Sequence, residues 1–354
     1  MIDQLTLTNF TAFSDLDIKF SPKINIIIGE NSTGKTQLLK AAYGLCNGGS
    51  SFKEVSDIDK EDLEKALTGS LTRLFMPLHD KLGKLHHQGA SENAQLSATF
   101  RQDKKVHLTF YHNSKSVVVH ESSSYEHPLP APVFIPTKEV LSLMKGFVSL
   151  YDKYGLSFDQ TYKDICLLLD LPEVRPDVLH EKSKWAMDEI KKVCGGDFIF
   201  YGGGNVTFKT NNSEFSANVI AEGFRKMGML SRLLETGVIQ PGDTGTLFWD
   251  EPETNMNPIL MKLLVEILLE LSRNGQQIII ATHDYVLLKW FDLLMDKDKD
   301  DHVTFHSLYR DPESKEIKRA STDNFMDISP NPIDDAFGYL INKEIENDMG
   351  GLGK

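Results

Sequence analysis

The chemistry that this sequence can do starts with residues 29–36, which read GENSTGKT. They match the pattern G-x-x-x-x-G-K-[ST], a loop that binds a phosphate chain. The apolar residues 26–28 precede the loop, and a helical pattern over 37–42 follows it. A strand, a glycine-bearing turn and a helix bring backbone amides and the positive helix N-terminus to phosphate oxygens. A glycine turn that holds no ligand is the alternative.

Several positions of the loop have an expected part in binding. Gly29 and Gly34 let the backbone come close to the phosphates, and Lys35 reaches the β- and γ-phosphates. The Thr36 hydroxyl can bind Mg²⁺. The other loop positions expected to contact the nucleotide are Asn31, Ser32, Thr33 and Gln37.

A second apolar strand, expected over 245–251, ends in the carboxylates Asp250 and Glu251. At the carboxyl end of a parallel strand these acids would lie beside the phosphate loop. We expect Asp250 to hold Mg²⁺, usually through water, and Glu251 to orient and deprotonate the attacking water. The alternative is a strand that ends in an acidic turn or a helix cap. Another buried strand, over 276–282, leads to His283, although a lone histidine is often structural.

Composition limits the class of protein. The chain has 354 residues, of which 40% are hydrophobic, enough for a sizeable core in one large domain or two. Its 51 acidic and 38 basic residues give a net charge of −13, so the surface as a whole does not attract nucleic acid. A local basic groove is the alternative. Cys46, Cys166 and Cys194 form no C-x-x-C pair, which favours a reducing compartment over a structural zinc site. Without a signal peptide or a transmembrane stretch, we expect a soluble cytoplasmic protein with no membrane partner.

Periodicity predicts the elements that position these residues. Residues 44–51 (GLCNGGSS) are expected to form a loop, 121–132 a Ser- and Pro-rich link and 296–301 (DKDKDD) a charged solvent loop. The expected strands are 2–9, 16–20, 23–28, 133–135, 245–251, 276–282, 303–309 and 317–320, with a hairpin over 197–210 and a three-strand antiparallel meander over 95–100, 105–111 and 116–120. Helical patterns cover 37–42, 56–83, the stretch up to 153, 156–171, 179–193, 218–237 and 333–347.

The opening residues 5–36, LTLTNFTAFSDLDIKFSPKINIIIGENSTGKT, resemble the N-terminus of the SMC, RecF and OLD-like ABC ATPases. Those heads begin with a strand, an Asn-Phe turn, a second strand and the nucleotide loop. The resemblance implies an α/β fold, a P-loop NTPase head of the ABC type with a mixed central sheet, a small antiparallel sheet and a helical lobe. It also implies that Asn9, Phe10 and Thr11 lie near the adenine or ribose. The alternative is a turn whose Phe10 and Phe13 simply pack in the core.

Residues 218–237 form a helical pattern that Ala221, Glu222 and Gly223 open. This stretch resembles the ABC signature motif, whose helix N-terminus meets the γ-phosphate bound by the other subunit. Ala221 stands where the family usually has serine, which removes one hydroxyl contact, and Glu222, Gly223 and Arg225 are the expected contacts in trans. An ordinary amphipathic core helix is the alternative. A signature that acts in trans implies a homodimer, or a higher homo-oligomer, with ATP at the interface.

Two further features of the family can be sought in this chain. A histidine at the end of the neighbouring strand contacts the γ-phosphate in the family, and His283 matches that switch histidine. A glutamine senses Mg²⁺ and the γ-phosphate, and the turn at 135–139 (IPTKE) is the first place to look for it. Gln160 is a weaker candidate for the same role.

The middle of the chain shows no sustained heptad register, because Gly155, Pro172 and Pro176 interrupt the helical pattern. We therefore expect a compact helical lobe in place of a coiled-coil arm, and no room for a TOPRIM nuclease domain. Three segments are expected. They are an ATPase lobe with the phosphate loop and small sheet (1–120), a helical lobe (121–213) and the rest of the ATPase head (214–354).

The resemblance implies an enzyme, a Mg-dependent ATPase that binds ATP and acts as a dimeric switch. Similarity to compact ATPases of bacterial anti-phage defence points to control of a separate effector, a toxin or a nuclease. One alternative is a RecF-like DNA-repair ATPase that binds nucleic acid in a basic groove. Another is a scaffold that binds ATP and hardly hydrolyses it, which Ala221 favours and Glu251 opposes. Basic side chains near the turns of the predicted meander, which could also be simply solvated, are Arg101, Lys104, Lys105 and Lys115.

Overall fold

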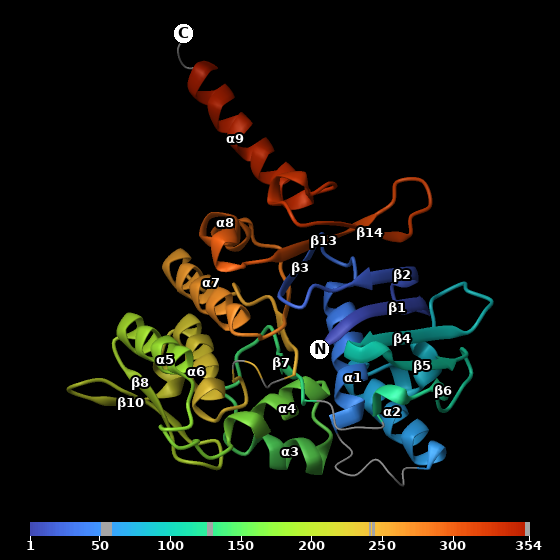
Figure 1. Ribbon diagram of the computed structural model, residues 1–354, viewed down its shortest axis with the longest axis horizontal. Coiled ribbons are helices and arrows are strands. Elements are labelled where there is room, and N and C mark those ends of the chain that lie inside the picture. Colours follow the sequence, from blue (N-terminus) through green and yellow to red (C-terminus); the bar gives the residue numbers. More distant parts are fainter. Residues whose placement is uncertain (51–58, 126–129, 241, 243–244, 351–354) are drawn as a thin grey trace.

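The computed structural model of the chain describes residues 1–50, 59–125, 130–240, 242 and 245–350. In this part of the chain, six strands form a central sheet of order β14-β13-β3-β12-β11-β7 (Figure 1). All neighbouring strands are parallel except β13 and β14. The predicted mixed sheet is therefore confirmed. Its strands are β3 (Ile24–Gly29), β7 (Val133–Ile135), β11 (Leu247–Asp250), β12 (Ile278–Ala281), β13 (Val303–Arg310) and β14 (Ile317–Thr322).

A second, antiparallel sheet has five strands within the described residues, in the order β2-β1-β4-β5-β6. The expected meander is β4, β5 and β6, and β1 pairs with β4, so the two opening strands enlarge it. Along strands β4 and β5, buried residues alternate with more exposed ones, because one face of the sheet packs on helices α1 (Lys35–Ser50) and α2 (Lys60–Phe75). The strands are β1 (Ile2–Phe10), β2 (Phe13–Lys19), β4 (Ala94–Phe100), β5 (Lys104–Phe110) and β6 (Val118–Glu121).

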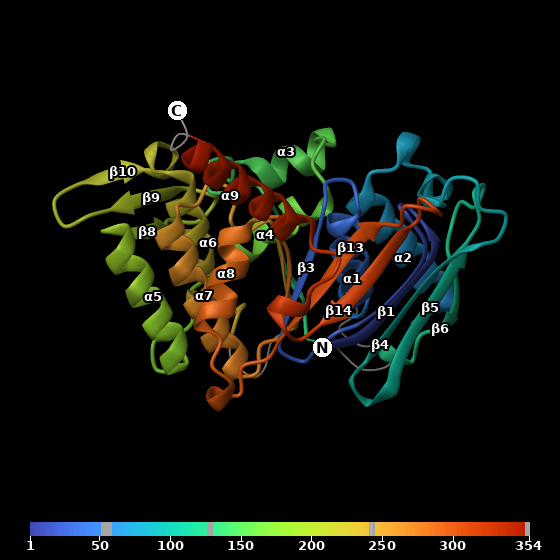
Figure 2. The same cartoon turned by 90° about the horizontal axis from the view of Figure 1, so that it is seen from above.

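The other face of the central sheet is covered by helices, and a small third sheet packs on α6 (Glu222–Glu235) on the far side of these helices (Figure 2). The predicted hairpin over 197–210 is confirmed as β8 (Asp197–Phe200) and β9 (Val206–Lys209), and β10 (Glu214–Ser216) adds an unpredicted edge strand. The last helix projects away from the body (Figure 1). The helices are α3 (Phe147–Tyr154), α4 (Gln160–Leu169), α5 (Glu181–Cys194), α6 (Glu222–Glu235), α7 (Pro258–Arg273), α8 (Tyr285–Leu294) and α9 (Pro332–Gly350).

Strand β3 shows why the central strands are apolar without interruption. Ile26 and Ile28 belong to the hydrophobic core that includes α6, α7 and α8, whereas Ile27 belongs to the core shared with α1 and the antiparallel sheet. All three side chains are fully buried. A strand covered on both faces has no polar side, and this rigid strand delivers the phosphate loop to the edge of the sheet.

The predicted loop at 44–51 is wrong for residues 44–50, which continue helix α1, and residue 51 lies outside the described chain. The glycines there permit close packing. A Cβ on Gly44 would lie 2.9 Å from Leu74, and one on Gly48 would lie 2.7 Å from Leu67 and 2.8 Å from the Tyr125 hydroxyl. Glycine thus lets α1 approach α2 closely, although it lowers helix propensity.

The predicted helix over 56–83 is too long. Helix α2 ends at Phe75, because Met76 takes a left-handed conformation (φ 47°) and Pro77 follows. Of the predicted elements, residues 56–58 and 126–129 lie outside the described chain. The division into 1–120, 121–213 and 214–354 stays a prediction, and the central sheet takes strands from all three segments.

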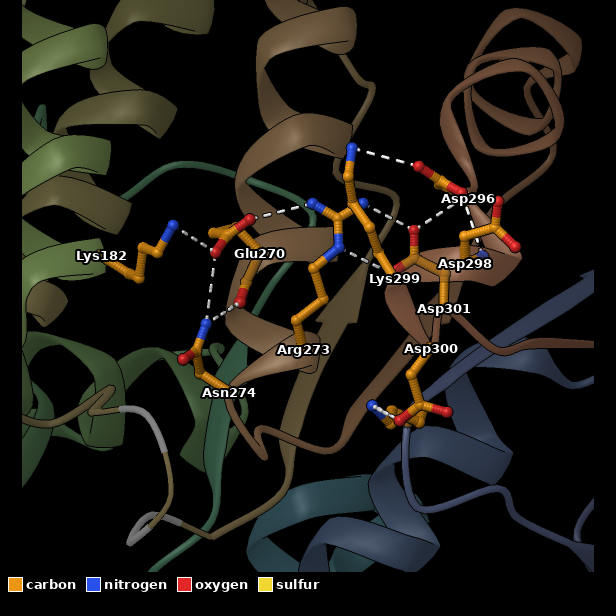
Figure 3. Close-up of polar contacts among 10 residues, drawn as sticks. Lys182, Glu270, Arg273, Asn274, Asp296, Asp298, Lys299, Asp300 and Asp301 are labelled. Atoms are coloured by element: carbon orange, nitrogen blue, oxygen red, sulfur yellow. Dashed lines mark hydrogen bonds and ion pairs between the residues drawn. The ribbon is translucent and has the colours of Figure 1, made fainter.

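Charged side chains form a network at the amino ends of the parallel strands (Figure 3). Arg273, at the end of α7, donates to both carboxylate oxygens of Asp301 at 2.8 and 2.6 Å and to Glu270 at 2.9 Å. Lys182 of α5 pairs with Glu270 at 2.8 Å. The loop predicted to be solvated is thus partly buried, since the Asp301 side chain is 1% exposed. We call Lys182, Glu270, Arg273 and Asp301 the distal clamp.

Candidate nucleotide-binding site

The phosphate-loop motif folds as strand, turn and helix, as its sequence predicts, with β3 entering it and α1 leaving it. Gly29 and Gly34 have φ values of +153° and +89°. A Cβ on Gly29 would lie 2.3 Å from the Leu308 carbonyl oxygen, and one on Gly34 would lie 2.7 Å from the Phe13 ring. Only glycine fits both positions, so the loop is held against β13 and β2.

Lys35 is buried and folds back over its own loop. Its Nζ donates to the carbonyl oxygens of Gly29 at 2.7 Å and Glu30 at 3.0 Å. Burial lowers the pKa of Lys35, while the carboxylates of Glu251 and Asp250 oppose that shift. An ammonium group held by two carbonyls can exchange these contacts for phosphate oxygens, which carry more negative charge. Thr33 also bonds within the loop, from its hydroxyl to Glu30 O at 2.8 Å.

Asp250 ends β11 directly beside the start of α1. Its Oδ2 accepts hydrogen bonds from the hydroxyls of Thr36 at 2.8 Å and Thr137 at 3.1 Å. Its Oδ1 is buried and has no hydrogen-bond partner among the described residues. Burial raises the pKa of Asp250, and the two hydroxyl bonds oppose that shift. A buried carboxylate oxygen without a partner and two adjacent hydroxyls are hard oxygen donors, so this set fits Mg²⁺.

Glu251 and His283 approach each other from the ends of two neighbouring strands. His283 Nδ1 lies 3.2 Å from Glu251 Oε1 and 3.8 Å from Glu253 Oε1. Glu251 has a left-handed backbone (φ 48°), which is rare and strained for a residue other than glycine. Half of the His283 side chain is exposed, so the pair faces the open end of the sheet.

Glu253 is a site residue that the sequence analysis missed. It is buried, its Oε1 accepts from the Thr282 hydroxyl at 2.7 Å and the His283 amide at 3.3 Å, and its Oε2 has no partner in the described chain. Burial raises the pKa of Glu253, and the hydrogen bond from Thr282 opposes that shift. Its carboxylate fixes the backbone that carries His283. An acid two residues after Glu251 was visible in the sequence, but its partner Thr282, directly after β12, was not.

The helix predicted over 218–237 is α6, and it begins at the same edge of the sheet. Ala221 is its N-cap and contributes no side-chain hydrogen bond, so the helix N-terminus is left without that cap. Glu222 is half-buried. A Cβ on Gly223 would lie 2.9 Å from the Asn255 carbonyl oxygen, so glycine lets α6 pack tightly on the loop after β11. Arg225 is engaged within the chain, because its Nε lies 2.8 Å from Glu139 Oε1.

The turn at 135–139 reaches the site, and Gln160 does not. Because β7 runs parallel to β11, the turn after β7 brings Thr137 to Asp250. Gln160 instead accepts from Arg73 at 2.8 Å and donates to Asp164 at 2.6 Å, beside a cavity of about 450 Å³ between α1, α2 and α4. Gln160, the weaker candidate for the glutamine that senses Mg²⁺ and the γ-phosphate, therefore contacts neither the phosphate loop nor the acids at the site.

The Asn-Phe turn packs its phenylalanine rings into the core. Phe10 and Phe13 are fully buried, and the Phe10 ring meets Phe75 edge-on at 5.2 Å. Asn9 has a left-handed backbone and donates to Asn93 O at 3.4 Å. Gln37 accepts from the Ala12 amide at 3.2 Å, which ties α1 to this turn. The predicted nucleotide contacts of Asn9, Asn31, Ser32 and Gln37 stay predictions.

Comparisons with known protein families agree with this geometry. Residues 1–132 match an AAA ATPase domain, and residues 205–289 match a family described as "AAA domain, putative AbiEii toxin, Type IV TA system". The DNA replication and repair protein RecF of Lactobacillus acidophilus is 32% identical over 164 residues, 46% of this chain and 37% of that protein. RecF of Ligilactobacillus salivarius is 28% identical over 185 residues, 52% of this chain and 42% of that protein. The chain thus spans less than half the length of these relatives.

Solved structures show the same fold. The SMC head bound to the C-winged helix domain of ScpA has a TM-score of 0.54 at 14% identity and covers 91% of this chain and 97% of its own. The SMC head domain from Thermotoga maritima has a TM-score of 0.51 at 12% identity, with 91% and 98% covered. Fold and phosphate loop together define a P-loop head of the ABC type. With the family matches, the chain is an AAA/ABC-type ATPase head that is related to RecF and has the fold of SMC heads.

The AAA ATPase domain implies that the chain binds ATP. In the part of the chain that the structure describes, no helix has the length and apolar character needed to cross a membrane.

Proposed function

We propose that this ATPase head hydrolyses ATP with Mg²⁺ and works as a nucleotide-dependent dimeric switch. The observation that carries the proposal is the unpartnered Oδ1 of Asp250, whose other oxygen, Oδ2, accepts from the Thr36 hydroxyl at the end of the phosphate loop. Leaving such an oxygen buried and unbonded costs free energy. A bound Mg²⁺ would satisfy it and would neutralise charge on the phosphate oxygens.

The roles of the remaining side chains follow from their places. Lys35 exchanges its loop carbonyls for the β- and γ-phosphates, and Thr36 and Asp250 hold the metal. Glu251 accepts the proton of the attacking water, and its 3.2 Å contact with His283 orients the carboxylate. His283 is half-exposed and can reach the γ-phosphate from β12. Thr137 lies beside the metal ligand Asp250 and takes the role that a glutamine has in other heads, which is to sense Mg²⁺ and the γ-phosphate.

The position of α6 supports the proposed dimerisation. Its N-terminus opens at the nucleotide edge, and Ala221 gives it no side-chain cap. Free amides at a helix N-terminus bind phosphate. We propose that Glu222 and Gly223 meet the γ-phosphate of a second copy, with backbone amides in place of the serine hydroxyl that Ala221 lacks. Arg225 can join only after leaving Glu139.

The switch is proposed to control a separate effector, a toxin or a nuclease, in anti-phage defence. The match of residues 205–289 to a domain family linked to the AbiEii toxin supports this reading. A RecF-like role on DNA is the second candidate, and the RecF relatives favour it. The net charge of −13 opposes it, because DNA binding depends on basic surface.

The mass of the protein in solution tests the switch. We expect wild type to dimerise with Mg-ATP, Glu251→Gln to prolong the dimer because ATP stays intact, and Lys35→Ala to stay monomeric. The same mass in all three proteins, with and without nucleotide, would contradict the switch. Steady-state phosphate release separates an ATPase from a scaffold that only binds ATP. Binding to duplex DNA that weakens steeply with salt would favour the RecF-like role.

A further inference from the structure

A buried lysine connects the signature helix to the hydrolytic loop. Lys226 lies on α6, is 1% exposed, and donates from Nζ to the main-chain carbonyl of Glu251 at 3.2 Å. Burying an ammonium group is costly unless it is paired. Burial lowers the pKa of Lys226 to about 8, although Glu253, Glu222 and Glu251 act in the other direction. A buried ammonium group that costs free energy suggests that Lys226 has a role besides packing.

The hydrogen bond acts on the residue whose backbone is strained. Glu251 has φ 48°, and its amide donates to Ala281 O on β12 at 2.8 Å. Its carbonyl accepts from Lys226 and also from the Thr254 amide at 3.2 Å. The two sides of this residue are therefore fixed by two different elements, β12 and α6. A strained conformation persists only where its surroundings hold it, so the α6 contact helps to set the direction of the Glu251 side chain.

The same face of α6 touches the loop a second time, one turn earlier. Gly223 lies so close to Asn255 that a Cβ would meet the Asn255 carbonyl oxygen at 2.9 Å and the Met256 Cα at 3.4 Å. Residues three apart share a helix face. The first turn of α6 is thus packed against residues 251–256 by one close backbone contact and one charged hydrogen bond.

We propose that Lys226 is a positioning residue that holds the Glu251 side chain in the direction needed for hydrolysis. It also couples the position of Glu251 to the binding of the partner's nucleotide at the N-terminus of α6. This inference rests on the proposed function, in which that N-terminus acts in trans. A shift of α6 moves Nζ and with it the carbonyl of Glu251. Hydrolysis then depends on a completed dimer, because a misplaced base loses most of its effect.

A second buried cation on α6 provides the matched control. Arg232 is 5% exposed and lies about two turns beyond Lys226, since a helical turn takes 3.6 residues. It donates to Leu169 O at 3.1 Å and Leu171 O at 2.9 Å and pairs with Glu173 at 3.1 Å. Arg232→Met therefore removes a buried positive charge from the same helix without touching the loop after β11.

The experiment compares Lys226→Met and Arg232→Met with wild type in steady-state ATP hydrolysis. For Lys226→Met we expect kcat to fall by roughly 10- to 100-fold, with KM within about threefold of wild type and an ATP-dependent dimer of the same mass as wild type. For folded Arg232→Met we expect kcat within about threefold of wild type. Lys226→Gln, neutral, polar and shorter, is expected to behave like Lys226→Met and serves if the methionine variant does not fold. Wild-type kcat in a folded Lys226 variant would overturn the proposal.

Hydrogen–deuterium exchange of residues 251–257 tests this inference separately from the proposed function. We expect exchange there to be at least about tenfold faster in Lys226→Met and unchanged in Arg232→Met, because only the first frees the loop. If wild type showed no turnover, the ATPase proposal would fail, and this exchange would still decide the positioning claim. Equal exchange in wild type and Lys226→Met would overturn it.

Discussion

The two ends of the parallel strands carry similar side chains in opposite states. At the carboxyl ends, Asp250 Oδ1 and Glu253 Oε2 are buried without a partner in the described chain, and Glu251 has a strained backbone. At the amino ends, Arg273 satisfies both oxygens of Asp301 and also binds Glu270. One oxygen each of Asp250 and Glu253 is thus left unbonded at one edge, whereas both oxygens of Asp301 are paired at the other.

This difference separates the nucleotide edge, where unbonded buried oxygens lower the stability of the fold, from the distal clamp, where the charges are paired. A buried polar atom without a partner costs free energy, so its persistence points to a ligand that supplies the missing bond. The distal clamp has no such vacancy among its ionised groups and joins α5, α7 and the loop before β13 (Figure 3). Substitutions at the nucleotide edge should therefore change activity more than stability, and those at the clamp the reverse.

The largest contrast is expected from removing one carboxylate charge at each edge. Glu251→Gln should lower kcat by about 10²- to 10⁴-fold, because the amide cannot accept the proton of the attacking water. Glu270→Gln removes a carboxylate of the clamp and should leave the kcat of the folded protein unchanged. Phosphate release measured at saturating ATP checks both. A loss of kcat that is equal in the two variants would contradict the division between the edges.

The clamp should show the reverse pattern. Arg273→Met leaves Asp301 buried without its charged partner, and breaking such a pair costs about 3 to 5 kcal/mol in free energy of unfolding. Nucleotide affinity should stay as in wild type, because no clamp residue contacts the phosphate loop. Urea unfolding and titration with a fluorescent ATP analogue measure the two quantities. An affinity that falls in parallel with stability would show that the two edges are coupled.

Ligand addition should relieve the cost at the nucleotide edge. Mg-ATP at one hundred times its Kd should raise the free energy of unfolding by about 2.7 kcal/mol. Asp250→Asn should remove the magnesium-dependent part of that gain, and the apo variant should be at least as stable as wild type because a buried charge is gone. Thermal unfolding with ATP and either Mg²⁺ or a chelator tests this. A strongly destabilised apo variant would mean that Asp250 mainly supports the fold.

The sequence predicted those parts of the site that a contiguous pattern encodes. The phosphate loop, the acids after β11 and His283 after β12 each follow a buried strand, and parallel strands bring their ends to one edge. Glu253 and Lys226 could not be predicted, and Thr137 only as a member of the turn at 135–139, because their roles depend on register between separate elements. Lys226, in particular, follows three residues after Gly223 in an ordinary helical pattern, and only the fold places its Nζ at Glu251.

The errors in the predicted fold have a related cause. Gly44 and Gly48 were assigned to a loop from composition, yet their spacing of four places both on the face of α1 that meets α2. Local sequence alone does not tell a glycine that breaks a helix from one that lets two helices approach. The distal clamp was invisible for the same reason, since Arg273 and Asp301 lie far apart in sequence and meet only in the fold.

The smallest effect is expected at the outer end of the clamp. The Lys182 side chain is 45% exposed, and its partner Glu270 keeps Arg273 as a second cation. A solvent-exposed pair contributes little, so Lys182→Met should lower the free energy of unfolding by only about 0 to 1 kcal/mol, and less at high salt. Urea unfolding at low and high salt measures this. A loss as large as that of Arg273→Met would mean that the network acts as one cooperative unit, in which the link between α5 and α7 depends on every member.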